Sequence, residues 1–197
     1  TECISGVGLS PEKDVSLAID VASTQFFDGT NYNLIALDKK FSSGEFNSFI
    51  SKLVSDHPVL SIEDPFAEDD WQSWTQFMSM APAKLQVLGD DLFTTNLARL
   101  QRGIDEKSAN AILIKANQNG LVTATQKVLT TAQTNNFKTV VSARSGETED
   151  SWLADLATGW RASQIKVGST HGADRTAKWN RLLELEATEN CEFAKPF

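Results

Sequence analysis

The chain has 197 residues, of which 41% are hydrophobic and 22% are charged, as in ordinary globular domains. This composition excludes a disordered tail, a collagen-like fibre and a coiled coil, and no apolar run approaches the roughly 18 residues that a membrane helix needs. Lys and Arg number 18 against 26 Asp and Glu, so the formal net charge is -8. We therefore expect neither nucleic acid nor a membrane as partner, because phosphate binding favours a basic surface.

The two cysteines, Cys3 and Cys191, lie near opposite ends of the chain, outside any CxxC or Cys/His motif. This usage excludes a disulfide scaffold and indicates a reduced, cytoplasmic setting. The chain begins with Thr and shows no secretory signal, so we expect it to be part of a longer protein.

Short apolar runs rich in Val, Ile and Leu recur along the chain, and each ends in polar or charged residues. Near-continuous apolar runs of this length are typical of strands buried on both faces of a parallel sheet. The predicted strands are Ser16–Ala22, Val59–Pro65, Leu85–Asp91, Ala111–Asn117, Lys138–Arg144 and Gln164–Gly168.

Segments with helical periodicity separate these runs. In Ser43–Asp56, apolar side chains follow the i, i+3, i+4, i+7 spacing of an amphipathic helix. The other predicted helices are Asp69–Met80, Thr95–Glu106, Leu121–Thr134, Glu149–Gly159 and Ala173–Ala187. Only Ser23–Lys40 interrupts the alternation, and its turn signal between apolar runs predicts a local hairpin.

Six strands alternating with helices predict an α/β fold with parallel strands. Right-handed crossovers leave an open doubly wound sheet or a TIM-type (β/α)8 barrel. No glycine-rich phosphate loop follows a strand, which weakens the open nucleotide-binding sheet. A barrel needs eight strands, so the barrel interpretation predicts two further strands before Thr1.

Polar residues end every predicted strand, which places them at one rim of a parallel sheet, where barrel active sites are built. The first three strands supply carboxylates and the last three supply cations and a hydroxyl. In chain order these residues are Asp20, Glu63, Asp64, Asp90, Asp91, Lys115, Arg144, Ser145 and Lys166.

Carboxylates from three strands form a hard oxygen site suited to Mg2+. The cations opposite would bind an anion, and a lysine beside other cations can act as a base. Any single one of these residues has an ordinary interpretation as a cap, a turn residue or a solvated rim charge. The ordered series of six strand ends favours a metal-assisted lyase or isomerase.

The strings SIEDPF, EDDW, VLGDDL, ILIKANQNG, VVSARSGETED and QIKVG stand in order along the chain. With RTAKWNRLLELEA, they make the sequence resemble the C-terminal barrel part of enolase, phosphopyruvate hydratase. The resemblance implies that residues 1–197 are a partial (β/α) barrel domain, with six of eight strands. It also implies a smaller N-terminal α+β domain and two first barrel strands that this sequence lacks.

By this resemblance, the chain belongs to a cytoplasmic, homodimeric lyase that reversibly dehydrates 2-phosphoglycerate to phosphoenolpyruvate in glycolysis. Asp20, Glu63 and Asp90 look like ligands of the catalytic Mg2+, and Glu63 also faces the substrate. Lys115 looks like the base at carbon 2 and Lys166 like the cation that faces the substrate carboxylate. Arg144 and Ser145 look like the phosphate binders. From their positions beside these residues, we predict that Asp64 and Asp91 orient Lys115 or the metal-bound water, and that Gln118 either supports Lys115 or begins a helix.

Three departures from the family pattern leave alternatives open. Ala143 stands where the family has a histidine that lines the substrate site, and Gly168–Arg175, which contains His171, replaces an Arg-Ser-Glu-Arg-like string. The family's general-acid glutamate precedes the first metal ligand, and the residues before Asp20 in this sequence contain no motif that matches it. The alternatives are a catalytically silent relative with a binding role, and a superfamily lyase that acts on another carboxylate.

Overall fold

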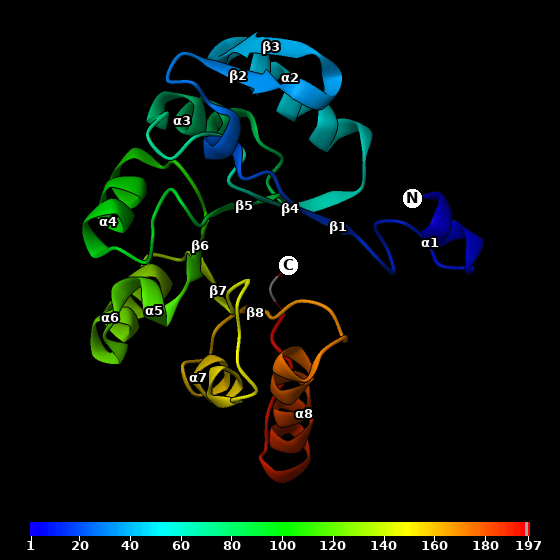
Figure 1. The fold of residues 1–197 in the computed structure, drawn as a ribbon, viewed down its shortest axis with the longest axis vertical. Helices are drawn as coiled ribbons and strands as arrows, with labels where there is room; N and C mark the ends of the chain where they lie inside the picture. The colour runs from blue at the N-terminus through cyan, green and yellow to red at the C-terminus, as the bar shows by residue number, and fades with distance from the viewer. Residues whose placement is uncertain (196) are drawn as a thin grey trace. The chain divides into compact units, whose positions relative to one another are not determined.

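The computed structural model describes residues 1–195 and 197 and divides them into two compact units (Figure 1). The first unit comprises Thr1–Phe93 and Gln101–Asn110, and the second comprises Thr94–Leu100 and Ala111–Phe197. Each unit is described by itself below.

The first unit contains three parallel strands in the order β1, β4, β5, with bounds Leu17–Asp20, Val59–Glu63 and Gln86–Gly89. Strand β1 pairs with β4 so that Asp20 lies opposite Glu63, and β4 pairs with β5 so that Glu63 lies opposite Leu88. All four residues of β5 and four of the five in β4 are buried, as expected of strands covered on both faces. The carboxyl ends of β1 and β4 therefore bring two of the predicted carboxylates into register.

An aromatic cluster packs the local hairpin of the first unit against its helices. The hairpin is formed by β2 (Asn31–Leu34) and β3 (Lys39–Ser42), and α2 (Ser43–Asp56) follows directly. The Tyr32 ring, which is fully buried, stacks on Phe46 of α2 with centroids 4.2 Å apart, and Phe66 meets both edge-on. Such aromatic pairs favour a single packing arrangement beyond their buried area.

The carboxylate of Asp70 joins three elements of the first unit. It caps helix α3 (Trp71–Met80), where its side chain accepts the Ser73 amide, and its Oδ2 also accepts the hydroxyls of Ser43 and Ser73. The Tyr32 hydroxyl donates to the same oxygen at 2.8 Å and accepts the Ala67 amide at 3.0 Å. The hairpin is therefore fixed to the segment that follows β4.

The Phe93 ring fills the space that a side chain at position 89 would occupy, so only glycine fits there. A Cβ on Gly89 would lie 2.6 Å from the Phe93 ring, and a Cβ on Gly103 of helix α4 (Leu97–Glu106) would lie 2.4 Å from it. Both distances are far below van der Waals contact, so the two glycines permit the fully buried Phe93 to lie under the turn that carries Asp90.

The second unit repeats the strand–helix pattern. Its parallel strands follow the order β6 (Ala111–Ile114), β7 (Lys138–Ser142) and β8 (Gln164–Lys166). Its helices are α5 (Ala116–Asn119), α6 (Val122–Thr134), α7 (Trp152–Gly159) and α8 (Ala173–Thr188). Figure 1 shows α7 and α8 side by side. Their polar tie is the Arg181 guanidinium, which donates to the Asp155 carboxylate at 2.7–3.2 Å.

The six predicted parallel strands and six predicted long helices are confirmed, with ends moved by a few residues. The predicted hairpin is present, with its turn at η2 (Ile35–Leu37), and its second strand extends to Ser42, two residues beyond the predicted end. Before β2, Asp28 accepts the amides of Thr30 and Asn31. In the described part of the chain, four short helices were not predicted, because segments of three to five residues carry little periodicity: α1 (Glu2–Gly6), η1 (Ser23–Phe26), η2 and α5.

Helix lengths and hydropathy give one further result. Among the residues that the structure describes, no helix combines the length and the apolar character needed to span a bilayer.

We expect Tyr32→Phe to lower the free energy of unfolding by about 1–3 kcal/mol, because the Ala67 amide loses its acceptor in a buried place and Asp70 loses a donor. Urea unfolding followed by circular dichroism measures the change. Ser48→Ala is the control, since its exposed hydroxyl only donates to Gly44 within α2, and its effect should stay within about 0.5 kcal/mol. Equal effects in the two variants would contradict a role for the Asp70 network in stability.

Candidate metal and anion site

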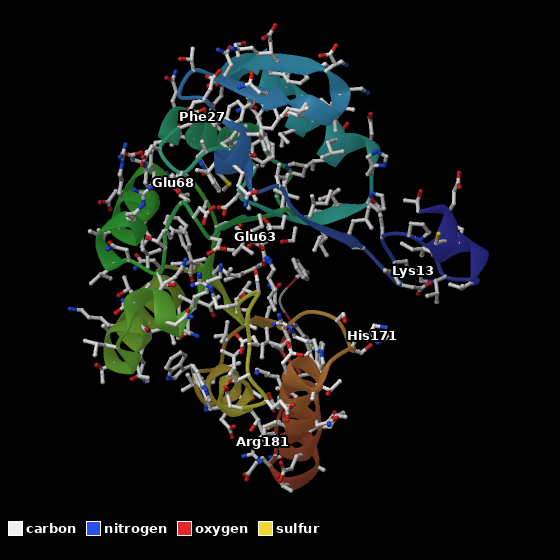
Figure 2. The ribbon with its side chains drawn as sticks, in the orientation of Figure 1. Lys13, Phe27, Glu63, Glu68, His171 and Arg181 are labelled. Atoms are coloured by element: carbon white, nitrogen blue, oxygen red, sulfur yellow. The ribbon has the colours of Figure 1, made fainter. Side chains whose placement is uncertain are left out.

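Three buried carboxylates converge at the carboxyl ends of β4 and β5. Oxygens of Glu63, Asp64 and Asp90 all lie within 4.8 Å of one another. The exposed fractions of these residues are 5%, 2% and 8%. Figure 2 labels Glu63 at the end of its strand. Carboxylates this close and this buried repel one another strongly unless a proton or a cation compensates their charge.

Backbone hydrogen bonds to the Asp64 side chain set the geometry of this cluster. Its two oxygens accept the amides of Asp90 at 2.9 Å and Asp91 at 2.8 Å. Its own amide donates to Leu88 O in β5 at 3.0 Å. The turn after β5 is therefore held against the end of β4, which brings the Asp90 carboxylate beside Glu63.

Burial raises the pKa of the Asp64 carboxyl to about 8, and the charges of Asp90 and Asp91 act in the same direction. The two amide hydrogen bonds oppose this shift but do not cancel it. At neutral pH, without a cation, this carboxyl therefore retains a proton for a substantial part of the time.

Backbone strain is present where β1 and β4 end. Ala22 and Asp64, which follow these strands, adopt left-handed φ values of 49° and 42° although neither is glycine. Such conformations cost of order 1–3 kcal/mol each and persist where surrounding contacts over-determine them. The contacts are visible at Asp64, whose carbonyl accepts the amide of Ser23, while the Ser23 hydroxyl donates to Pro65 O.

Asp20, the first predicted ligand, lies at the end of β1 opposite Glu63 in the strand register. It is exposed and is not one of the three carboxylates with mutually close oxygens. The structure therefore brings Glu63 and Asp90 together as expected and adds Asp64 to the cluster, whereas Asp20 lies beside it in the neighbouring strand. Its role as a ligand stays a prediction.

The donor set fits a hard divalent cation. Three carboxylates supply only oxygen ligands, which is the preference of Mg2+, and their mutual repulsion in a buried place favours a compensating ion. Glu63 and Asp90, with Asp20 or Asp64 as a third carboxylate, are the residues that would hold such an ion.

Lys115, in the second unit, is positioned through its backbone. It follows β6 as the N-cap residue of α5, and its amide donates to the Thr95 hydroxyl at 2.9 Å. That hydroxyl donates in turn to Oε1 of Gln118 at 3.0 Å, and Asn119 donates to Thr95 O at 3.1 Å. Gln118 therefore supports Lys115 through Thr95, which is fully buried. The sequence predicted Thr95 only as the first residue of the helix Thr95–Glu106, so its role beside Lys115 was missed.

The other predicted cations lie at the carboxyl ends of β7 and β8. Arg144, Ser145 and Lys166 are exposed, as side chains that meet a soluble anion must be. Ala143 is buried to 8% exposure and extends the β7–β8 pairing, since its amide donates to Lys166 O at 2.9 Å. The Arg144 guanidinium donates to the Asn117 side chain at 3.1 Å. His171 lies in the loop between β8 and α8, where its amide donates to the Ser169 hydroxyl (Figure 2).

A cavity of about 560 Å3 lies elsewhere in the first unit. Its lining includes Phe27 and Glu68 (Figure 2), with Thr24, Ser43 and Asp69, but none of the three converging carboxylates. The candidate site is therefore defined by the converging carboxylates rather than by this cavity.

Parallel strands that alternate with helices and end in charged residues define an α/β protein of the kind found in barrel enzymes. A family sequence model described as "Enolase, C-terminal TIM barrel domain" matches residues 1–195. The chain therefore belongs to the enolase family, and its fold class is that of the TIM barrel. Proteins of this family generally bind a small-molecule substrate, and membership indicates a lyase-type enzyme.

The raised pKa of Asp64 predicts that the stability of the metal-free protein falls as pH rises. Below about pH 4 the carboxyl is protonated in both states. Between pH 4 and pH 8 the unfolded chain loses this proton while the folded chain keeps it, so the contribution is progressively lost. At about 1.4 kcal/mol per pKa unit the loss amounts to a few kcal/mol.

Thermal unfolding in chelator at pH 5, 6, 7 and 8 measures this effect, with Asp64→Asn as the matched variant. We expect the Tm difference between the two proteins to change steadily in favour of the variant as pH rises. A constant difference across this range would show that Asp64 does not titrate in the fold as inferred.

Proposed function

We propose that this protein is an enolase-type hydro-lyase that reversibly converts 2-phosphoglycerate to phosphoenolpyruvate. The observation that carries the proposal is the buried cluster of Glu63, Asp64 and Asp90 in a chain of the enolase family. Removal of the proton at carbon 2 is difficult because it lies next to an ionised carboxylate, and the negative charge that develops there requires strong electrostatic stabilisation.

Glu63 and Asp90 would hold Mg2+, with Asp20 as the third ligand implied by the family resemblance. When bound, the ion supplies positive charge that stabilises the carboxylate of the substrate as its negative charge grows. Asp64 contributes through the amides of Asp90 and Asp91, which it holds in place. Glu63 has the second role of facing the substrate from the end of β4.

Lys115 is the proposed base, whose Nζ takes the proton from carbon 2. Its backbone is fixed by Thr95, so the side chain leaves from a defined position at the end of β6. Lys166, at the end of β8, would face the substrate carboxylate and stabilise the charge that appears there. The hydroxyl of carbon 3 then leaves as water, with a proton from a general acid that the resemblance places upstream of Asp20.

Arg144 and Ser145 are the proposed phosphate ligands. A guanidinium presents a planar fork of donors that matches two phosphate oxygens, and the hydroxyl adds a neutral donor. Both residues are exposed on the loop after β7, which is consistent with contact to a small soluble anion.

Ala143 is the observation that favours a second candidate, a lyase acting on another carboxylate or a silent relative. A methyl group in place of an imidazole removes one polar contact from the substrate site that the resemblance implies. Without the imidazole, the site would no longer favour 2-phosphoglycerate over a carboxylate that lacks a hydrogen-bonding partner for that imidazole. Turnover assays with a panel of 2-hydroxy and 3-hydroxy carboxylates decide between these candidates.

We further propose that the active species is a cytoplasmic homodimer that also carries the N-terminal domain implied by the resemblance. The free, exposed thiols of Cys3 and Cys191 are consistent with a reducing compartment. Light scattering during size-exclusion chromatography of the complete protein measures the oligomeric state.

The proposal predicts that Lys115→Ala lowers kcat for 2-phosphoglycerate by about 10²–10⁴-fold or more, because proton abstraction loses its base. The appearance of phosphoenolpyruvate by ultraviolet absorbance measures it in the complete protein with Mg2+. Lys127→Ala, which removes an exposed lysine of α6, is the matched control and should turn over normally. Near-normal kcat in Lys115→Ala would contradict the assignment.

Metal removal gives an independent test of the carboxylate cluster. We expect chelator to abolish turnover and added Mg2+ to restore it. Glu63→Gln should weaken Mg2+ binding and so raise the half-saturating Mg2+ concentration by about 10-fold or more. Glu106→Gln, in an exposed ion pair with Arg102, is the control. Turnover that persists in chelator would exclude the proposed mechanism.

A further inference from the structure

The loop after β7 carries both proposed phosphate ligands but is exposed along Arg144, Ser145 and Gly146. Exposed loops with few backbone partners are mobile. Binding that relies on such a loop would carry the entropic cost of ordering it each time. The backbone partners of this loop therefore matter for how well it binds an anion.

Arg175, in the first turn of α8, holds this loop through its carbonyl groups. Its Nη1 donates to Arg144 O at 2.8 Å and to Val167 O at 3.0 Å, and its Nη2 donates to Ser145 O at 2.8 Å. The Arg175 side chain is 16% exposed, and Asp174 approaches its Nε at 3.1 Å. One guanidinium therefore joins the loop after β7 to the segment after β8 that follows Lys166.

Lys178, one turn further along α8, holds the same loop from a second point. Its side chain is fully buried, its Nζ lies 3.1 Å from Glu147 Oε2, and it also donates to Thr148 O. Glu147 uses its other oxygen to accept the Arg144 amide at 2.7 Å. A buried ammonium carries a large desolvation cost, so its pairing with Glu147 must be well formed for the fold to tolerate it.

The two cations hold the loop by different routes. Arg175 donates to the carbonyls of Arg144 and Ser145, whereas Lys178 pairs with Glu147, whose carboxylate accepts the Arg144 amide. Arg175 and Lys178 are three residues apart and are therefore neighbours on α8. Arg181, labelled in Figure 2 further along α8, pairs with Asp155 of α7 instead.

We propose that Arg175 and Lys178 are positioning residues that preset the backbone of Arg144 and Ser145 for binding a phosphate group. The inference rests on the proposed phosphate role of Arg144 and Ser145. Neither α8 residue contacts the substrate in this scheme; each acts through the loop. Because binding strength depends on placing donors within a fraction of an ångström, loss of a tie should weaken phosphate binding more than it slows the chemical step.

Arg175→Gln tests the proposal in the complete protein, since glutamine retains polarity but cannot span three carbonyl groups. We expect KM for 2-phosphoglycerate and the dissociation constant of inorganic phosphate, from titration calorimetry, each to rise by about 10-fold, with kcat changed by less than about threefold. Lys178→Met should give the same pattern through Glu147. Arg175→Lys restores the charge but not the fork, so its values should lie between those of wild type and Arg175→Gln.

Arg181→Gln is the matched control, because it removes the same residue type from the same helix without touching the contacts of Arg175. It should lower Tm through the lost Asp155 pair while leaving KM and phosphate binding within about twofold of wild type. A general loss of helix docking would instead move all three variants together, and that result would overturn a specific positioning role.

The remaining outcomes distinguish a failure of the positioning role from a failure of the proposed enolase-type function. Wild-type turnover and phosphate binding with unchanged values in Arg175→Gln and Lys178→Met would overturn the positioning role alone. A wild-type protein that neither turns over 2-phosphoglycerate nor binds phosphate would overturn the proposed function and this inference with it. If Arg175→Gln does not fold, Arg175→Lys and Lys178→Met still decide the question.

Discussion

The acceptance of two successive backbone amides by the Asp64 carboxylate is the interaction on which the candidate metal site depends. It ties the end of β4 to the turn after β5 and so places the Asp90 carboxylate within reach of Glu63. The same arrangement buries three carboxylates together and raises the pKa of Asp64. A site assembled in this way is strained without a cation, and its strain is the physical reason that a divalent ion would bind there.

The second unit carries the positively charged residues of the proposed mechanism. The proposed substrate-facing cations Arg144 and Lys166 are exposed. The cations that hold the loop after β7, Arg175 and Lys178, have largely buried side chains. Lys115 is likewise fixed through its amide by the buried Thr95. In both cases the group proposed to act and the group that positions it are different residues, as preorganised sites require.

Ala143 is the position where the family resemblance implies a departure from the usual pattern. The residues proposed for proton abstraction and metal binding are all present, and the resemblance places the histidine that Ala143 would replace in the substrate site. The backbone at Ala143 still pairs with Lys166, so the replacement alters the side-chain surface rather than the strand. Substrate preference is therefore the property that this position is expected to change.

The sequence by itself determined the six parallel strands, the long helices and the strand-end residues, because burial on both faces and helical periodicity leave direct patterns in the residue order. It also supplied Glu63 and Asp90 as neighbours, since parallel strands align their carboxyl ends. Only the tertiary structure decided that Asp64 joins them, that Thr95 supports Lys115, and that Arg175 and Lys178 hold the loop of Arg144. The hydrogen bonds from Lys115 to Thr95 and from Arg175 to Arg144 link residues 20 and 31 positions apart, and each involves a backbone group. Such bonds leave no periodic signature, so their partners become known only when the chain is folded.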